Sequence, residues 1–595
     1  MTRSAAQAVT NSYSLSSPSH QAPQISVVTG IRRLLPVMEG EYGLVVQALI
    51  AVIITSTSGL LGPMIVGNTV DQYIRNPNFH GVWMSALILL GVYLCGLCSS
   101  YFQTQRMGSV GRNVLFNLRN TLFTKLQSLP VAFFNQNRSG DLISRINNDT
   151  DKLNQFFSQA LVQFAGNTFM MAGAGIFMVS LSPRLGLTAL LPALGVLIVT
   201  QTISPWVKRK NLRNLQSVGG MSSEIQESLS NFKVIVAFNR TDYFRDKFNE
   251  ANERNFASAV DAGVASNIFM PIYGLSQNLA QVVVIGYGFY LVTAGTISLG
   301  LLIAFVLYLN SFYMPLRQLA AMWAQLQLAL AAVDRISEVL ALEPNMPLLV
   351  SARVAGAPLL KFESVSFGYR EGQHILKDTS FALERGKTYA LVGPTGGGKT
   401  TTASLMARLY DPASGTVRLE GRDIRSFSPE ERTEKIGFIL QEPFLFTGTV
   451  RDNITYGNAK YRDLSSEELV EVLKQNNLGE LLVRFEQGLD TKVTSTGDSI
   501  SLGQKQLIAF MRAALRNPEL LILDEATANI DTITEQLLQN ILNKLPKTTT
   551  KVIIAHRLNT IANADEIFFV NAGEITPAGS MEHAVDMLLR GKRES

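Results

Sequence analysis

Residues 393–400 form a glycine-rich segment whose spacing could bind phosphate. The run Gly393-Pro394-Thr395-Gly396-Gly397-Gly398-Lys399-Thr400 matches the phosphate-loop pattern G-x-x-x-x-G-K-[ST] at every fixed position. It follows the apolar run Tyr389-Ala390-Leu391-Val392 and precedes a helix-forming stretch that begins at Thr401. Glycine lets backbone N–H groups curl around phosphate oxygens, and a helix N-terminus adds positive potential. We expect Lys399 to reach the β and γ phosphates of a nucleotide and Thr400 to ligate Mg²⁺.

A second candidate site lies at the end of the apolar run Leu520-Leu521-Ile522-Leu523, which is followed by Asp524 and Glu525. A run that is apolar at every position predicts a central parallel strand buried on both faces. Asp524 then emerges where it can order the shell of a Mg²⁺ ion, and Glu525 can polarise an attacking water. The pair therefore predicts nucleotide hydrolysis next to the phosphate loop.

The elements that must position these residues belong to a chain of two different compositions. Of the 595 residues, 17% are charged and the formal net charge is +5. Residues 1–340 are about 11% charged and carry the basic excess, whereas residues 341–595 are about 24% charged and slightly acidic. The first part is depleted of charge like a membrane domain, and the second resembles a soluble domain. We do not interpret the basic excess as a nucleic-acid footprint, because basic residues that flank a membrane would give the same excess.

Six apolar stretches each approach the roughly 20 residues that cross a bilayer as a helix. They lie at about 43–68, 81–104, 158–181, 185–205, 264–294 and 297–320. Two connections of roughly 50 to 60 residues carry basic side chains, among them Arg106, Arg119, Lys208 and Arg209. Because basic loops stay on the cytoplasmic side, we expect these connections and both termini in the cytosol. Their helical periodicity predicts that the spanning helices continue beyond the bilayer.

The expected fold is therefore multidomain, an all-α six-span transmembrane domain followed by an α/β domain that contains the phosphate loop. Residues 1–23 are polar and predict a disordered lead, and residues 24–340 form the transmembrane domain. The proline-containing segment Glu343-Pro344-Asn345-Met346-Pro347 ends the helix that leaves the sixth span, so we expect a linker at 341–358. Alternating strand-like and helix-like runs at 359–592 predict a parallel sheet with helices.

With these motifs the chain resembles bacterial ABC exporter half-transporters, whose transmembrane domain precedes the nucleotide domain. The most specific marker is Ile500-Ser501-Leu502-Gly503-Gln504, which is similar to the family signature LSGGQ. The resemblance implies that ATP and Mg²⁺ bind at the phosphate loop and that Tyr369 stacks on adenine. It also implies catalytic roles for Gln441, Glu525 and His556, with Thr400, Gln441 and Asp524 around the metal. The implied location is the bacterial cytoplasmic membrane, with the nucleotide domain in the cytosol.

The signature segment also predicts a partner chain. In the family, two nucleotide domains close over two ATP molecules, each held between one phosphate loop and the other chain's signature. Ser501, Gly503 and Gln504 match this pattern, whereas Leu502 replaces a glycine and brings bulk and a stiffer backbone. An altered signature beside an intact Glu525 is similar to one chain of heterodimeric relatives. We therefore favour a heterodimer over a homodimer.

The transmembrane stretches predict the substrate only by class. No charged residue lies in the middle of the six stretches. Uncharged polar and soft residues could instead line a cavity or join helices: Gln163, Asn167, Met170, Met171, Gln201, Asn267, Gln277, Asn278, Gln281 and Asn310. The resemblance then implies ATP-driven export of hydrophobic or amphipathic compounds, as by multidrug exporters. A lipid flippase and an ATP-gated channel stay open, whereas the six stretches disfavour a soluble cassette ATPase and the fusion of both domains disfavours an importer.

Overall fold

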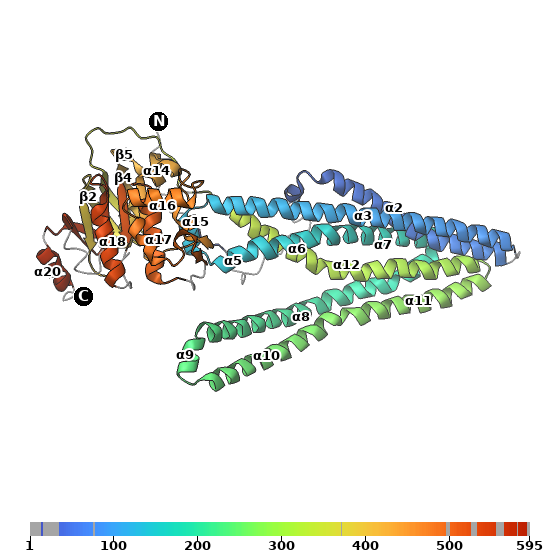
Figure 1. The fold of residues 1–595 in the computed structure, drawn as a ribbon. Helices are drawn as coiled ribbons and strands as arrows, with labels where there is room; N and C mark the ends of the chain where they lie inside the picture. Colours follow the sequence, from blue (N-terminus) through green and yellow to red (C-terminus); the bar gives the residue numbers. More distant parts are fainter. Residues whose placement is uncertain are drawn as a thin grey trace, which may run out of the picture. The chain divides into compact units, whose positions relative to one another are not determined.

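The structure, a computed structural model, describes residues 13–15, 35–74, 78–344, 346–370, 372–494, 500–524, 532–554, 564–579 and 581–591. The chain divides into two compact units, and Figure 1 labels many of their elements. The helical unit comprises Ser16–Lys125 and Gly140–Leu340. The α/β unit comprises Met1–Leu15, Leu126–Ser139 and Ala341–Ser595. Residues 126–139 were expected in the transmembrane domain, but their contacts group them with the α/β unit.

The helical unit confirms the six apolar spans. Among the described residues, six helices are long and apolar enough to cross a membrane: Tyr42–Tyr73, Phe79–Ser128, Ser139–Leu181, Pro183–Ser230, Thr241–Thr293 and Leu299–Leu340. Five of these run for 42 to 53 residues, well beyond the about 20 that a bilayer needs, as their periodicity predicted. The elements in order are η1 (Leu35–Met38), α2 (Tyr42–Ile74), α3 (Phe79–Ser128), α5 (Ser139–Ser144), η2 (Arg145–Asp149), α6 (Thr150–Gln155), η3 (Phe156–Ala160), α7 (Leu161–Leu181), α8 (Pro183–Ser230), α9 (Phe232–Ala237), α10 (Thr241–Asn267), α11 (Phe269–Thr293) and α12 (Leu299–Leu340).

Small residues allow these helices to approach closely. A Cβ atom added to Gly67 of α2 would lie 2.7 Å from the carbonyl oxygen of Gly300 in α12. The Asp71 carboxylate of α2 accepts a hydrogen bond from the Gly300 backbone N–H at 2.7 Å. Close backbone approach at small residues is how helices associate where lipid supplies no hydrophobic drive.

A cluster of ion pairs joins the α5 and η2 segment of the helical unit to α12. Arg145, of which 1% is exposed, pairs with Asp141 at 3.0 Å and with Glu338 of α12 at 2.7 Å. Arg335 of α12 pairs with Asp141 and with the buried Asp149. Because buried charges need partners, this cluster fixes the α5 and η2 segment against α12.

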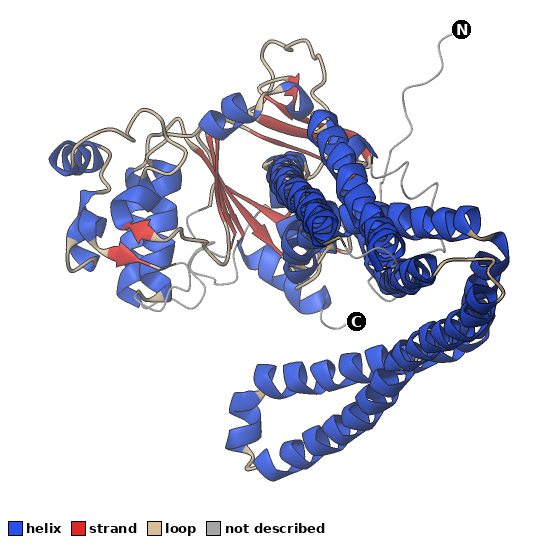
Figure 2. Ribbon diagram, turned by 90° about the vertical axis from the view of Figure 1, so that its right-hand side faces the viewer, coloured by secondary structure: helices blue, strands red, loops and turns tan. Residues whose placement is uncertain are grey.

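The α/β unit contains the parallel sheet that alternating runs predicted (Figure 2). Its six strands have the order β12-β11-β3-β10-β9-β6, and all neighbours are parallel except β11 and β12. A four-stranded antiparallel sheet has the order β2-β1-β4-β5, and β7 pairs with β8. The strands are β1 (Leu360–Phe367), β2 (Leu376–Leu383), β3 (Thr388–Val392), β4 (Ser414–Leu419), β5 (Arg422–Asp423), β6 (Ile436–Ile439), β7 (Gly448–Thr449), β8 (Lys492–Val493), β9 (Leu520–Asp524), β10 (Thr550–Ile554), β11 (Glu566–Asn571) and β12 (Glu574–Pro577).

Two apolar clusters cover the two faces of the parallel sheet. Along β9, Leu520 and Ile522 face a core shared with the antiparallel sheet, and Leu521 and Leu523 face a core shared with α17. This alternation explains why β9 is apolar at every position before Asp524. The helices of this unit are α4 (Val131–Gln136), α13 (Lys399–Met406), η4 (Ile424–Ser426), α14 (Pro429–Lys435), α15 (Val450–Ile454), α16 (Ser466–Gln475), η5 (Gly479–Arg484), η6 (Gly488–Asp490), α17 (Leu502–Ala514), α18 (Thr532–Lys544) and α20 (Met581–Gly591).

The N-terminal segment differs from expectation at residues 13–15. These were expected within a disordered lead at 1–23, but Tyr13 is 1% exposed and Leu15 is 9% exposed. Their backbone N–H groups donate to the side chains of Gln136, the last residue of α4, and of Asn137, the residue after it, far away in the sequence. The other residues of the expected lead lie outside the part of the chain that the structure describes.

Candidate nucleotide site and membrane cavity

The phosphate loop connects β3 to α13, as its sequence context predicted. Gly393, Gly396 and Gly398 have φ angles of +149°, +82° and +113°, a region that side chains rarely tolerate. A Cβ atom at Gly393 would lie 2.0 Å from the Val570 carbonyl oxygen, and one at Gly397 would lie 2.6 Å from the same oxygen. The glycines are therefore required both by the turn and by the close strand β11.

The loop leaves room for phosphate on its outer side. A Cβ atom at Gly396 would meet nothing within 4 Å, and Thr395 and Gly396 are exposed. Lys399 is 6% exposed, and its Nζ donates to the carbonyl oxygens of Gly393 at 2.9 Å and Pro394 at 3.0 Å. A cation folded over a glycine loop at a helix N-terminus is a suitable site for a polyphosphate.

Thr400 and Asp524 come together at the carboxyl edge of the sheet. The Thr400 hydroxyl donates to Asp524 Oδ1 at 3.3 Å, and Asp524 is 3% exposed at the end of β9. A hydroxyl and a carboxylate side by side are oxygen ligands of the kind that Mg²⁺ prefers. The donor set thus fits the metal that the sequence predicted.

Gln441 follows β6, the neighbour of β9. Ile439 pairs with Leu523 in the parallel ladder, so Gln441 and Asp524 leave adjacent strands at the same edge. Gln441 is exposed there. This placement is compatible with its expected role near the metal.

Tyr369 lies in an aromatic cluster beside the loop. Its hydroxyl is 3.2 Å from the Thr401 hydroxyl, and its ring meets Tyr410 edge to face with centroids 5.2 Å apart. Because 39% of Tyr369 is exposed, the ring retains an open surface that a planar base could stack on.

Tyr410 was not singled out in the sequence, although it joins this cluster to α4. Asn135 of α4 donates to the Tyr410 hydroxyl at 2.6 Å. Burial raises the pKa of Tyr410, while the hydrogen bond from Asn135 acts in the opposite direction. No local sequence pattern predicts the contact between Asn135 and Tyr410, because the two residues are 275 positions apart.

The signature segment forms the N-terminus of α17. Ser501 is the N-cap, and its hydroxyl accepts from the Gln504 backbone N–H at 3.2 Å while Gln504 Oε1 accepts from the Ser501 N–H at 2.8 Å. Gln504 Nε2 also donates to the Arg484 carbonyl at 2.7 Å, and Gly503 is buried.

Leu502 adopts helical backbone geometry as the first residue of α17, and its side chain is 39% exposed. It is not among the described non-glycine residues with positive φ. The replacement of glycine therefore adds bulk at this position but no backbone strain, and the expected loss of backbone freedom stays a prediction.

Comparisons with known proteins agree with this geometry. The family profile described as ABC transporter transmembrane region matches residues 45–316, and that described as ABC transporter matches residues 376–528. An uncharacterized ABC transporter ATP-binding protein of Bacillus subtilis, YfiC, is 34% identical over 93% of this chain and 92% of its own length. The chain belongs to the ABC transporter family. It is an ABC ATPase coupled to transport, with the exporter arrangement of domains.

Two further relatives of this ABC transporter have names that state a substrate. A fatty acid ABC transporter ATP-binding/permease protein of Mycobacterium bovis is 34% identical over 86% of this chain and 81% of its own length. A multidrug resistance ABC transporter ATP-binding and permease protein of Lactococcus lactis is 30% identical over 86% of this chain and 87% of its own length.

Two expected catalytic residues of the transporter, Glu525 and His556, lie outside the described residues. The structure describes the strands that lead to them, since Asp524 ends β9 and Ile554 ends the neighbouring β10. The paired strands end level with each other, at Ile554 and Asp524. In the sequence, Glu525 and His556 therefore come just after two strands that end at the edge of the sheet where Thr400 and Gln441 lie.

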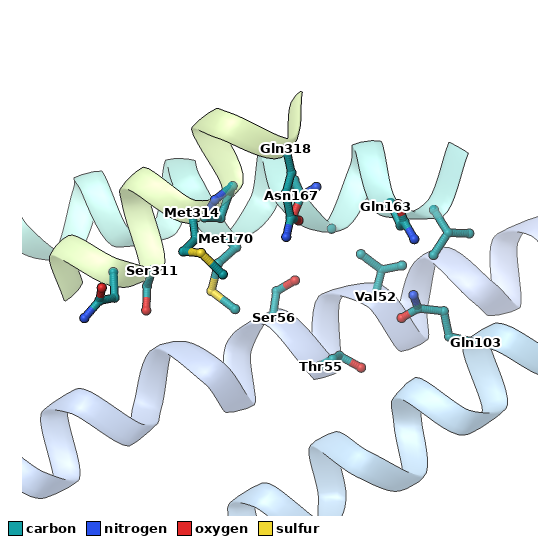
Figure 3. A pocket seen from close by; sticks show the side chains of 14 residues that line it. Val52, Thr55, Ser56, Gln103, Gln163, Asn167, Met170, Ser311, Met314 and Gln318 are labelled. Carbon is teal, nitrogen blue, oxygen red and sulfur yellow. The ribbon is translucent and has the colours of Figure 1, made fainter. Parts of the chain in front are cut away.

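The helical unit of the transporter contains a cavity of about 470 Å³ between α2, α3, α7 and α12 (Figure 3). Gln163, Asn167, Met170 and Asn310, four of the ten polar or soft candidates, line it. The other six candidates are not among its lining residues, and Gln277 instead donates to Asn310 at 2.7 Å as a helix-joining contact. Thr55, Gln103, Met314 and Gln318 line the cavity but were not predicted.

Proposed function

We propose that this transporter exports hydrophobic or amphipathic compounds, with ATP hydrolysis as the energy source. The membrane cavity carries the proposal. Its volume of about 470 Å³ lies within the roughly 300–1,000 Å³ of small-molecule sites, and none of its described lining residues is charged. Met170 and Met314 offer adaptable apolar contacts, and Gln163, Gln103 and Gln318 offer amides.

The cavity wall offers polar groups to an occupant with a polar end. Three glutamines, Gln103, Gln163 and Gln318, line the cavity together with the two methionines. An amphipathic molecule satisfies both the amides and the methionines. Fatty acids and many drugs belong to this class, so the names of the two relatives are compatible with it.

At the nucleotide site, we assign Lys399 and residues 393–398 to the phosphates, Thr401 to the helix N-terminus beside them, and Tyr369 to the adenine. Thr400 and Asp524 would hold Mg²⁺ together with Gln441, and the bound metal would neutralise charge on the phosphates. Glu525 would orient and polarise the attacking water, and His556 would contact the γ-phosphate. ATP binding does mechanical work only to the extent that it favours one conformation of the transporter over another.

A second chain completes the transporter in this proposal. Ser501, Gly503 and Gln504 of one chain would face the phosphate loop of the other. The tip of the helical unit at α9 presents exposed apolar side chains, Phe232, Val234, Val236 and Phe238, which fit an apolar surface on a partner. The bulk of Leu502 favours a heterodimer whose other chain has an unaltered signature. We place the α/β unit and both termini in the cytosol of a bacterium.

The test uses the complex that copurifies with this chain, reconstituted into lipid vesicles. A panel of dyes, fatty acids, phospholipids and peptides is screened for stimulation of ATPase activity and for ATP-dependent movement. Met170→Trp, which fills the cavity, should abolish stimulation by the transported compound. The matched control Ile176→Trp lies on the same helix α7 at a 68% exposed position and should leave it intact. Equal effects of both substitutions, or movement of no compound, would refute the proposal.

A further inference from the structure

The segment Tyr13–Leu15 is bound like an extended peptide ligand within the α/β unit. The Tyr13 backbone N–H donates to Gln136 Oε1 at 2.8 Å, and the Leu15 N–H donates to Asn137 Oδ1 at 3.0 Å. Asn137 Nδ2 donates back to the Tyr13 carbonyl at 2.8 Å. The Asn137 side-chain amide therefore accepts from one backbone N–H and donates to one backbone carbonyl of this segment, as the backbone of a neighbouring β-strand would.

Side chains of this segment alternate between a buried and an exposed environment. Tyr13 and Leu15 are buried, and Ser14 between them is exposed. This period of two is that of a strand with one face against a surface. Main-chain hydrogen bonds would supply affinity for such a peptide, and the burial of the Tyr13 side chain would supply specificity.

Tyr13 connects two parts of the α/β unit that are distant in sequence. Its ring meets Phe133 of α4 edge to face, with centroids 6.3 Å apart, and both side chains are almost fully buried. Its hydroxyl donates to the carbonyl oxygen of Glu343, in the linker after α12, at 3.2 Å. A buried tyrosine with a satisfied hydroxyl is a strong anchor.

The surface that holds Tyr13 is also connected to the nucleotide site. Asn135, two residues before Asn137, donates to Tyr410, whose ring packs on Tyr369. Two contacts therefore connect α4 to the expected adenine site: that of Asn135 with Tyr410, and that of Tyr410 with Tyr369.

We propose that α4 with Gln136, Asn137 and the Glu343 carbonyl forms a binding site for the chain's own N-terminal segment, and that its occupancy tightens coupling between substrate binding and ATP hydrolysis. Occupancy orders α4 and the linker together, so the Asn135–Tyr410 contact is held in place. The effect on coupling rests on the proposed export function, whereas the binding site itself does not.

The binding site is tested with the full-length chain purified in detergent. A fluorescein-labelled peptide of residues 8–20 is titrated against the wild-type chain, Tyr13→Ala and the matched control Ser14→Ala, and fluorescence anisotropy is recorded. If the native segment is seated for about 90% of the time, it weakens the apparent affinity of the added peptide about tenfold. The peptide should therefore bind Tyr13→Ala at least tenfold more tightly than the other two chains. A peptide with alanine in place of Tyr13 should bind none of them.

A measurement on the unaltered chain guards against a misfolded variant. Residue-resolved hydrogen exchange should show slow amides at Tyr13 and Leu15 and a faster amide at Ser14. Asn137→Ala should accelerate Leu15 at least tenfold. Failure of the peptide to bind Tyr13→Ala, equal binding to all three chains, or rapid exchange at Tyr13 and Leu15 would each overturn the site.

The coupling effect is read in lipid vesicles. Tyr13→Ala should reduce substrate stimulation of the ATPase at least threefold with basal activity unchanged, and Ser14→Ala should not. Unreduced stimulation in Tyr13→Ala overturns the coupling role. If no compound stimulates even the wild-type complex, the export function fails while the peptide and exchange results still decide the binding site.

Discussion

Leu502 offers a test of what its side chain does at the start of α17. The residue has helical backbone geometry, so its replacement of glycine in the signature should act through bulk and not through lost backbone freedom. Leu502→Ala removes the bulk and retains a good helix former, whereas Leu502→Gly removes the bulk and adds freedom. If bulk alone limits the approach of a partner chain's ATP, both substitutions should raise ATPase activity to a similar level.

The exposed fraction of the Leu502 side chain sets the expected loss of unfolding free energy. Complete burial of a leucine side chain contributes about 2 kcal/mol, and Leu502 is 39% exposed, so truncation to alanine should cost about 1 kcal/mol of unfolding free energy. Glycine should cost about 1 kcal/mol more because of its poor helix propensity. Against these small losses, restoring one backbone N–H contact to a phosphate should raise the hydrolysis rate about tenfold, equivalent to about 1.4 kcal/mol.

The assay measures ATPase activity and thermal unfolding of the chain purified alone, in which every shared site would use residue 502. Each variant is also measured with Glu525→Gln added, and only the ATPase activity that this substitution removes is attributed to the shared site. A rise in Leu502→Gly without a rise in Leu502→Ala would show that backbone freedom matters and would refute the reasoning. No rise in either variant would show that Leu502 does not limit hydrolysis.

Three further predictions concern the metal site, the α/β unit and the helical unit. Thr400→Val should lower Mg²⁺-dependent ATPase activity at least tenfold, because the hydroxyl beside Asp524 is lost, while nucleotide binding measured in chelator should stay within twofold. Burial raises the pKa of Glu420, but hydrogen bonds that include those from Arg385 and Lys435 outweigh it and hold the pKa at about 2. This depressed pKa contributes about 3 kcal/mol of stability above about pH 4.5 and loses it as the pH falls toward 2. Thermal unfolding of Glu420→Gln should therefore depend less on pH between 5 and 3 than that of the wild type, and an identical dependence would contradict the assignment. Arg145→Met should destabilise the helical unit by about 3–5 kcal/mol, because the buried side of its ion-pair cluster loses its cation, and unchanged thermal unfolding in detergent would contradict this.

The sequence predicted those features that depend on local pattern. The six spans follow from runs of apolar residues, and the phosphate loop follows from spaced glycines between a strand and a helix. The carboxyl edge of the sheet could also be predicted, because parallel strands that end in Asp524 and before Gln441 must meet at one edge.

Features that depend on the packing of distant segments could not be predicted. Thr55 and Gln103 are polar residues in apolar helices, and only the packing of α2, α3, α7 and α12 decides which of them face the cavity. The polar composition of residues 1–23 predicts disorder, but Tyr13 finds its partners at Gln136 and Glu343, more than a hundred residues away. The geometry of Leu502 was also not readable, because a glycine motif does not reveal whether its backbone needs a positive φ.

The central claim is that ATP hydrolysis at Glu525 drives an amphipathic compound across a membrane. The most direct measurement is ATP-dependent accumulation of a fluorescent amphipathic dye and of a labelled fatty acid in vesicles that contain the complex copurified with this chain. We predict that at least one compound accumulates with ATP and Mg²⁺, and that Glu525→Gln reduces its accumulation at least tenfold. Equal accumulation in the wild type and in Glu525→Gln, with robust ATPase activity in the wild type, would contradict the claim.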